Sequence, residues 1–293
     1  SMEYVVEMLN IRKEFPGIVA NDNIKLQLKK GEVHALLGEN GAGKSTLMGM
    51  LFGMYKPDRG CIKVRGKEVK ISNPNVANDL GIGMVHQHFK LVENFTVTEN
   101  ITLGCEPKKG LVVDIKTKRI EELSKQYGLN VDPYAKIEDI SVGMQQRVEI
   151  LKMLYRDANV LIFDEPTAVL TPSEIDELIS IIKEMTKEGK SVIIITHKLK
   201  EIKAVADKCT VIRRGKYIGT VDVKDTTESE MAKMMVGREV SFKVEKSEAK
   251  PQETVVSIKN ISVKNNKKVL GLKNFSLDIK AGEIVGIAGV EGN

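Results

Sequence analysis

The apolar positions of this chain follow two patterns that alternate along it. One is a set of short runs rich in β-branched residues, and the other is a set of longer stretches with apolar residues at every third or fourth position. Short runs of this kind fit buried strands, whereas the longer stretches fit helices with one apolar face. The short runs lie at 34–38, 81–86, 160–165, 191–196 and 209–215. This alternation predicts an α/β fold with a mainly parallel sheet flanked by helices.

The segment 89–156 differs from the rest of the chain because helical periodicity dominates it. Apolar residues recur with a helical period in "KRIEELSKQYGL", residues 118–129, and in "GMQQRVEILKMLYRDA", which starts at residue 143. The sequence therefore predicts a helical subdomain at about 89–156, inserted into the α/β core.

A repeat connects the beginning of the chain with its end. Residues 23–33, "NIKLQLKKGEV", align with residues 274–284, "NFSLDIKAGEI", and both have apolar residues at alternate positions. Such alternation predicts a half-buried strand that leads into a turn. The preceding segments match too, since "VVEMLNI" at 5–11 resembles "VVSIKNI" at 255–261, at an offset that differs by one residue. Two matching strands in the same order indicate a duplication on the scale of a domain.

The duplication sets the predicted domain boundaries. The charged segment 241–253 has no periodic apolar face, which is typical of a linker, and it separates a first domain at 1–240 from the start of a second at 254–293. The final residues 282–293, "GEIVGIAGVEGN", repeat the beginning of "GEVHALLGENGAGKST" at 31–46. We therefore expect the second domain to be truncated inside a loop. In that loop Val290, Glu291 and Asn293 stand where the first copy has Glu39, Asn40 and Ala42.

Composition excludes several classes of protein. A chain of 293 residues with 42% hydrophobic residues buries a large core, so it is not a disordered chain. Its longest apolar runs are far shorter than the roughly 20 residues that a membrane-spanning helix needs. The formal net charge of +5 comes from lysines interleaved with acidic residues, so we expect a solvated surface and no nucleic-acid partner. The isolated Cys61, Cys105 and Cys209 favour a reducing cytosol.

The strongest chemical signal is "GENGAGKS", residues 38–45, which follows an apolar run and precedes a helical stretch. It fits the pattern of a phosphate-binding loop, in which glycines let backbone N–H groups surround phosphate oxygens at a helix N-terminus. We expect Lys44 to reach the β and γ phosphates of a nucleoside triphosphate, and the Ser45 hydroxyl to ligate Mg²⁺.

Two adjacent carboxylates give the second signal. Asp164 and Glu165 follow four apolar residues at the end of a predicted buried strand, at the edge of the sheet where such folds bind ligands. We expect Asp164 to hold Mg²⁺ and Glu165 to act as general base or to position the attacking water. The alternative, that this pair caps the helix that follows, is weak because Pro166 to Pro172 intervene.

Polar residues also end two other predicted strands. His197 follows the strand at 191–196, which predicts a contact with the γ phosphate, and Gln87 follows the strand at 81–86, which predicts a contact with Mg²⁺ or the attacking water. His86 and His88 flank Gln87 without a cysteine or an acidic residue at ligand spacing, so we do not expect them to form a metal site.

The stretch 140–172, "ISVGMQQRVEILKMLYRDANVLIFDEPTAVLTP", resembles the signature and the aspartate-glutamate motif of ATP-binding cassette (ABC) ATPases. With the phosphate loop, Gln87 and His197 in the same order as in that family, the resemblance covers 4–239. The residues of the signature and the duplication resemble those of the ATP-binding subunits of importers for simple sugars and nucleosides. The resemblance is greatest to the nucleoside branch linked to basic membrane lipoproteins. This resemblance implies a P-loop NTPase fold with a mainly parallel core sheet, an antiparallel β subdomain and a helical subdomain.

The resemblance also implies roles for individual residues. Two cassettes of this family pair head to tail around ATP, so Ser141 and Gly143 would contact a γ phosphate held by the opposing cassette, at a helix start that suits an anion. Phe15 would stack on adenine, with a place in the core as the alternative. The phosphate loop would contribute Gly38, Glu39, Asn40, Gly41, Ala42, Gly43, Lys44, Ser45 and Thr46.

Departures from the family pattern concern the signature. Ile140, Val142 and Met144 replace the usual leucine, glycine and glutamine, so we expect the ATP site that this signature completes to turn over inefficiently. The usual aspartate after Pro166 is also replaced, around Leu170 and Thr171. The competent loop at 38–46 would need a signature from a second cassette.

Two functions remain after these observations. The first is a transport ATPase on the cytoplasmic face of the cell membrane, with transmembrane permease subunits as partners and a solute-binding protein as an indirect one. Its candidate contact with the permease is the segment 89–101, through Phe89, Leu91, Phe95 and Val97, although packing within the helical region explains these residues equally well. The second is a soluble tandem ABC ATPase that acts on ribosomes or nucleic acid. A short linker favours transport, and the solute is not encoded in these residues.

Overall fold

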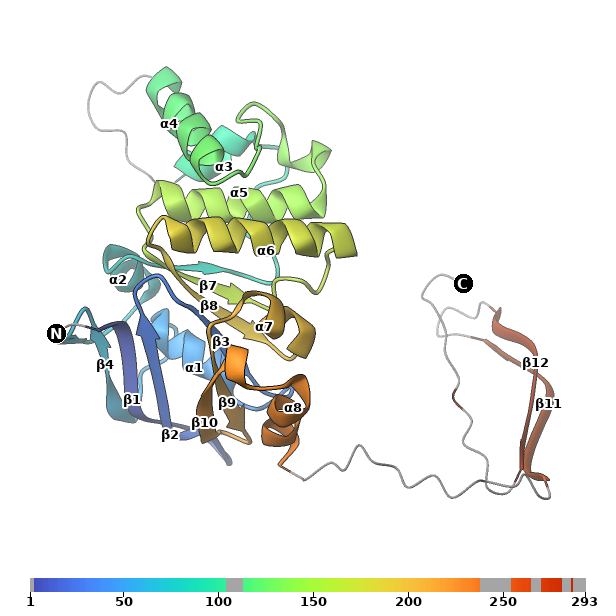
Figure 1. Ribbon diagram of the computed structural model, residues 1–293. Helices are drawn as coiled ribbons and strands as arrows, with labels where there is room; N and C mark the ends of the chain where they lie inside the picture. Colours follow the sequence, from blue (N-terminus) through green and yellow to red (C-terminus); the bar gives the residue numbers. More distant parts are fainter. Residues whose placement is uncertain (1–2, 104–112, 238–253, 265–269, 281–285, 287–293) are drawn as a thin grey trace. The chain divides into compact units, whose positions relative to one another are not determined.

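The computed structural model describes residues 3–103, 113–237, 254–264, 270–280 and 286 (Figure 1). The chain divides into two compact units, residues 1–239 and 240–293. The predicted linker at 241–253, Cys105, and Val290, Glu291 and Asn293 of the second loop lie outside the described residues.

A ten-stranded sheet forms the centre of the first unit, in the order β5-β4-β1-β2-β10-β9-β3-β8-β7-β6. Its antiparallel part contains β1 (Tyr4–Phe15), β2 (Ile18–Lys29), β4 (Arg59–Val64) and β5 (Lys67–Val69). Strand β10 (Lys216–Asp222) joins the two parts, since it pairs antiparallel with β9 and parallel with β2. Apolar and polar residues alternate in β1 and β2, so each presents one face to the core.

The parallel part of the sheet contains the short apolar runs of the sequence. It comprises β3 (Val33–Leu37), β6 (Ile82–Val85), β7 (Val160–Asp164), β8 (Ser191–Thr196) and β9 (Lys208–Arg213). Strands β3, β6 and β8 are buried along their whole length because helices and strands cover both of their faces. The prediction of an α/β fold with a mainly parallel core sheet is confirmed, and the antiparallel half extends that sheet rather than standing apart from it.

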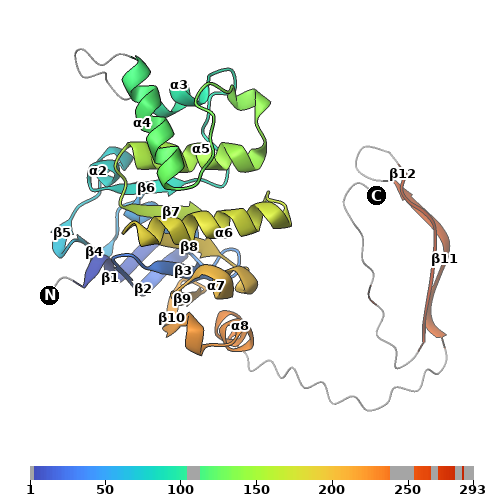
Figure 2. The same ribbon diagram turned by 45° about the horizontal axis from the view of Figure 1, so that its top comes forward.

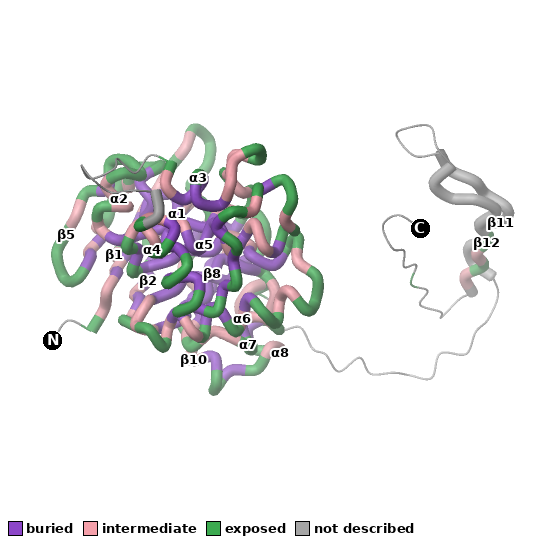
Figure 3. Tube along the Cα trace, turned by 90° about the horizontal axis from the view of Figure 1, so that it is seen from above, coloured by how far each residue is buried: buried purple, intermediate pink, exposed green. Residues whose placement is uncertain are grey.

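Helices cover the two faces of the parallel strands (Figure 2). On one face, α1 (Lys44–Leu51) packs with the antiparallel strands and with Ile162 and Ile193. On the other face, α6 (Pro172–Lys187) packs with Leu161 and Phe163 of β7. The remaining helices and turns of this core are α2 (Pro74–Asp79), α7 (Leu199–Val205), η2 (Val223–Asp225) and α8 (Glu228–Val236). Figure 3 shows the buried residues in the interior of this unit and the exposed ones around it.

In the described part of 89–156, helices are the main regular elements, as the periodicity predicts, and one isolated β-bridge joins Thr96 and Lys136. The helices are α3 (Val97–Thr102), α4 (Val113–Gln126), the 3-10 turn η1 (Ile137–Asp139) and α5 (Val142–Tyr155). Thr96 and Glu99 begin α3 with a capping box, in which each side chain bonds the other residue's backbone N–H. Helix α5 packs against α3, α4 and β6, so the helical segment rests on the edge of the parallel sheet.

The second unit contains a hairpin of β11 (Thr254–Lys264) and β12 (Leu270–Lys280). Its register repeats that of β1 and β2, since Met8 pairs with Leu26 and Ile11 with Ile24, while Ile258 pairs with Leu277 and Ile261 with Phe275. The register shifts also fall at corresponding places in the two hairpins. The duplication noticed in the sequence therefore extends to strand pairing and bulges.

Candidate functional site

The loop at 38–46 connects β3 with α1, and its shape depends on glycine. Gly41 and Gly43 have φ values of 83° and 99°, which residues with a Cβ atom rarely adopt. A Cβ on Gly43 would lie 2.4 Å from the carbonyl oxygen of Ala20 and 2.7 Å from Nδ2 of Asn21. The Asn21 amide also donates a hydrogen bond of 3.1 Å to the Gly43 carbonyl. Strand β2 thus supports the loop from behind, so that its N–H groups stay available for an anion.

Lys44, the first residue of α1, is 6% exposed. Its Nζ donates to the Gly38 carbonyl at 2.6 Å, and it lies 3.4 Å both from Oε1 of Glu165 and from the Thr196 carbonyl. The ammonium group therefore joins the loop to the ends of β7 and β8. A phosphate bound in the loop would replace the Glu165 carboxylate as the anionic partner of Lys44.

The two carboxylates at the end of β7 have different surroundings. Burial raises the pKa of Asp164 and the charge of Glu165 raises it further, against the opposing charges of Lys44 and His88. Glu165 has a φ of 45°, unusual for a residue with a side chain, and its N–H donates to the Ile195 carbonyl at 3.0 Å. This backbone conformation aims its side chain at Lys44 and away from the line of β7.

His197 lies on the other side of Glu165. Its Nδ1 is 3.1 Å from Oε1 of Glu165, the same oxygen that faces Lys44. The His197 side chain is 46% exposed, whereas that of Glu165 is 15% exposed. Glu165 is thus held between a cation and an imidazole, and the imidazole remains open to solvent on its far side.

A cavity of about 590 Å³ is lined by ten of the residues that the sequence predicts as a site. The other predicted residues are not part of its lining: Gly38, Glu39, Ala42, His197, Ser141 and Gly143. The loop residues Lys44, Ser45 and Thr46 line it together with Asp164 and Glu165. Phe15 lines its other end, where its ring packs edge-on against Tyr55 with the centroids 5.4 Å apart. Six further lining residues follow no pattern that predicts them: Ile18, Val19, Ala20, Ile195, Arg214 and Gly215. They come from the start of β2, from β8 and from the β9–β10 turn, whose approach to the loop depends on strand order.

Ser45, Gln87 and Asp164 line this same cavity. Their hydroxyl, amide and carboxylate oxygens are the donors that Mg²⁺ prefers, so the set fits such an ion. Within the part of the chain that the structure describes, three or more His, Cys, Asp or Glu residues nowhere gather as metal ligands. His86 instead stacks edge-on with Phe52 at 6.0 Å, and burial, followed by the charges of Lys90 and Lys152, lowers its pKa.

The signature residues lie elsewhere. Ser141 is the N-cap of α5, and its hydroxyl accepts a hydrogen bond of 3.2 Å from the Met144 N–H. Ser141 and Gly143 line a separate cavity of about 290 Å³ with Leu170 and Glu174. A single copy of this chain does not bring the signature and its own phosphate loop into one cavity.

The segment 89–101 takes part in the packing of the helical region, and its contact with a permease stays a prediction. Val97 is fully buried and Leu91 packs against the same cluster in the helical region, while Phe89 and Phe95 are half-buried. The buried Asn100 holds this segment in place, because its side chain accepts from the Val92 N–H at 2.7 Å and donates to the Val92 carbonyl at 3.0 Å. Val97 and Leu91 thus pack in the helical region, while Leu91, Phe89 and Phe95 each stay partly accessible.

Comparisons with known proteins show which sequences this chain resembles. The ABC transporter family model matches residues 21–168. The guanosine import ATP-binding protein NupO of Bacillus subtilis is 65% identical over 294 residues, and the nucleoside import ATP-binding protein NupA of Lactococcus lactis is 60% identical over 293. These alignments cover 100% and 99% of this chain and 58% of each relative.

Solved structures share the fold. The ADP conformation of MJ1267, an ATP-binding cassette of an ABC transporter, superimposes with a TM-score of 0.69 at 24% identity, over 81% of this chain and 96% of that chain. This likeness confirms the predicted P-loop NTPase fold of the cassette type. Among the residues that the structure describes, no helix is long and apolar enough to cross a membrane.

Proposed function

Because the chain belongs to the ABC transporter family, we propose that it binds and hydrolyses ATP to energise an importer of nucleosides or simple sugars. The observation that carries this proposal is the convergence of Lys44, Asp164, Glu165 and His197 around the loop at 38–46. The names of NupO and NupA, which are import proteins for guanosine and nucleosides, favour a nucleoside over a sugar.

The proposed chemistry begins when the phosphates of ATP enter the loop. The N–H groups at the start of α1 and the Lys44 ammonium bind phosphate oxygens, and Lys44 then exchanges the Glu165 carboxylate for phosphate. Glu165 becomes free to orient the attacking water and accept its proton, while His197 holds the carboxylate and contacts the γ phosphate. Ser45, Gln87 and Asp164 would hold Mg²⁺, which would supply positive charge beside the phosphates. Phe15 stacks on adenine at the other end of the cavity.

The proposed machine uses two cassettes. Ser141 and Gly143 lie away from the cavity of their own loop, so they complete a site on an opposing cassette. The matched registers of β1–β2 and β11–β12 support the proposal that residues 254–293 begin a second cassette. Transmembrane permease subunits on the inner face of the cell membrane are the proposed direct partners, with an extracytoplasmic solute-binding protein acting through them.

A soluble tandem ABC ATPase acting on ribosomes or nucleic acid is the competing function. Only 17 residues, 237–253, separate α8 from β11, which is short for a ribosome-acting relative. The half-buried Phe89 and Phe95 fit contact with another protein better than contact with nucleic acid, because they bring no positive charge.

Uptake measurements separate the two functions. In a strain that lacks the gene, we expect uptake of labelled guanosine to fall and to return with the full-length wild-type gene, but not with Glu165→Gln. Labelled ribose and galactose, measured in parallel, test the sugar alternative. Unchanged uptake of all these solutes, together with a translation defect, would contradict the transport function.

A further inference from the structure

The N-terminus of α5 is in contact with a carboxylate of the same chain. Glu174 belongs to the first turn of α6, and it lines the small cavity that Ser141 and Gly143 also line. A Cβ atom placed on Gly143 would lie 1.8 Å from Oε2 of Glu174. The carboxylate therefore rests directly on the Gly143 backbone, and only glycine leaves room for it there.

The other oxygen of this carboxylate is fixed to its own helix. Oε1 of Glu174 accepts a hydrogen bond of 3.1 Å from the Thr171 N–H, and the Glu174 N–H donates to the Thr171 hydroxyl at 3.3 Å. The Thr171 N–H and hydroxyl hold the pKa of Glu174 below its ordinary value, and the Gly143 N–H contributes in the same direction. Glu174 thus connects the starts of α5 and α6 as a charged group.

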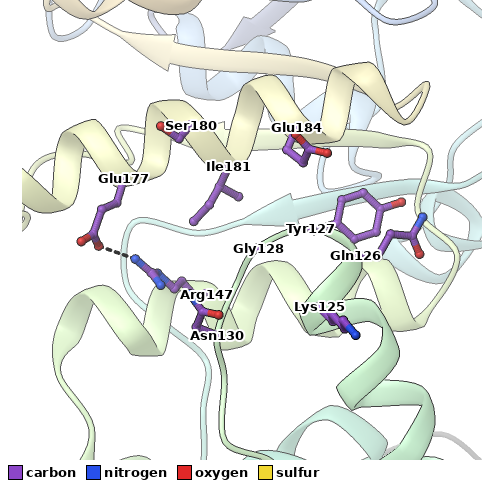
Figure 4. A pocket seen from close by; sticks show the side chains of 10 residues that line it. All are labelled: Lys125, Gln126, Tyr127, Gly128, Asn130, Arg147, Glu177, Ser180, Ile181 and Glu184. Carbon is purple, nitrogen blue, oxygen red and sulfur yellow. Dashed lines mark hydrogen bonds and ion pairs between the residues drawn. The ribbon is translucent and has the colours of Figure 1, made fainter.

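A second carboxylate of α6 holds the same helix one turn further on. Glu177 forms an ion pair with Arg147 of α5, and Figure 4 shows the two side chains pointing toward each other from neighbouring helices. Arg147 also donates to the Leu129 carbonyl at 2.9 Å. Glu174 and Glu177 therefore hold α5 at two points, one at its N-terminal N–H groups and one at a side chain.

We propose that Glu174 competes with the γ phosphate of an opposing ATP for the N-terminus of α5, so that two cassettes close on ATP only after this carboxylate has withdrawn. The inference rests on the proposed function, because it assumes that ATP lies between paired cassettes. A helix N-terminus favours one anion through its N–H groups and dipole, whereas a second anion at the same place is repelled. The Ser141 hydroxyl oxygen accepts a hydrogen bond from the Met144 N–H, so its O–H can still donate a hydrogen bond to the phosphate.

The competition makes closure depend on the γ phosphate. Displacing a carboxylate that is bonded at both of its oxygens costs free energy, and a terminal phosphate with two negative charges compensates for that loss better than a more distant β phosphate does. Glu174 therefore weakens the association of two cassettes with ATP and with ADP. It weakens the association less with ATP, so it makes pairing selective for ATP.

The test compares Glu174→Gln with the matched variant Glu177→Gln, both in a Glu165→Gln background that blocks turnover. Glutamine fits the capping box as glutamate does, so the start of α6 is retained. Glu177→Gln removes an equal charge from the same face of α6 but leaves Gly143 untouched. Sedimentation of the 293-residue chain gives its self-association with ATP and with ADP, and a fluorescent ATP analogue gives binding to the single chain.

We expect Glu174→Gln to strengthen ATP-dependent association by about 5- to 30-fold, the range that corresponds to a charge at a helix N-terminus. Glu177→Gln should change it by less than about twofold, as for an exposed ion pair. Binding of the analogue to the single chain should be equal in all variants. Equal association of Glu174→Gln and its parent, or an equal gain in Glu177→Gln, would overturn the inference and leave the proposed function standing. Absence of nucleotide binding in every variant would overturn both.

Discussion

The first turns of α1 and α5 are two places where we propose that backbone N–H groups bind a phosphate, and they differ in what surrounds them. At α1, two glycines with positive φ open the loop toward a cavity of about 590 Å³, and the buried cation Lys44 stands beside it. At α5, the carboxylate of Glu174 rests on Gly143. The dipole of a helix is the same in both places. Neighbouring elements therefore decide whether a helix start is ready for an anion or already holds one.

In both places a carboxylate lies against the group that would bind phosphate. Glu165 faces Lys44 at 3.4 Å, and Glu174 rests on Gly143. A phosphate that displaces Glu165 leaves that carboxylate beside the attacking water, where it is useful. A phosphate that displaces Glu174 places no carboxylate beside the attacking water. Release of a carboxylate therefore serves the chemistry at α1, whereas at α5 it only sets a threshold for closure.

The largest effect should come from Glu165→Gln. Loss of the general base should lower ATP turnover by about 100- to 10,000-fold, while binding of ATP is retained. Phosphate release by the full-length assembly measures turnover, and equilibrium binding of a fluorescent ATP analogue measures affinity. Glu201→Gln is the control, because Glu201 bonds Thr167 outside the cavity. Normal turnover in Glu165→Gln would remove Glu165 from the mechanism.

Lys44→Ala should lower the affinity for ATP and not only the rate of turnover. The change removes the cation that the phosphates need and leaves Asp164 and Glu165 without their buried positive neighbour. We expect the affinity for ATP to fall about 100-fold, which corresponds to roughly 2.7 kcal/mol. Titration of the fluorescent analogue measures this loss, with Lys198→Ala as a control on the same edge of the sheet. Affinity within about twofold of the wild type would show that the N–H groups alone hold the phosphates.

A substitution at Gly143 tests its contact with Glu174 at the start of α5, through the free energy of unfolding of the chain. Gly143→Ala places a Cβ atom where Oε2 of Glu174 lies, so the Glu174 side chain must turn away and give up its bond to Thr171. We expect a loss of about 0.5–1 kcal/mol in the free energy of unfolding. In a Glu174→Ala background the same change should instead stabilise the chain by about 0.5–1 kcal/mol, because alanine favours a helix over glycine. Urea unfolding of the four variants gives this double-mutant cycle. An equal effect in both backgrounds would show that Glu174 does not rest on Gly143.

The sequence predicted the α1 side of the comparison better than the α5 side. The loop at 38–45, the strand before Asp164 and the helical stretch after residue 89 are local patterns, and local physics determines them. Thr171 and Glu174 have the spacing of a capping box, which we did not use as a prediction and which accounts for one oxygen of Glu174 only. The contact of its second oxygen with Gly143 depends on how α6 crosses α5, which no periodicity encodes. The same holds for Ile18, Val19 and Arg214, which reach the cavity through strand order.

The smallest predicted effect concerns Glu149, a residue of α5 that binds the segment following Gln87. It is 2% exposed, and it accepts a hydrogen bond of 3.1 Å from the Lys90 N–H, three residues after Gln87. Burial raises the pKa of Glu149 from 4.5, against the charge of Lys152, the Lys90 N–H and the charges of Arg156 and Lys90. The folded state therefore binds a proton more tightly here than the unfolded state does.

Stability of the wild type should consequently fall as pH rises from the unfolded pKa through the folded one, and then level off. Glu149→Gln keeps an acceptor for the Lys90 N–H and has no charge to bury, so it should be more stable than the wild type near neutral pH. Below the unfolded pKa the carboxyl is protonated in both states, and the advantage should vanish there. Urea unfolding of both proteins across this range gives the difference at each pH. If the difference in the free energy of unfolding did not change with pH, ionisation of Glu149 would not be the cause of that difference. Packing alone would then hold α5 against the segment that contains Lys90.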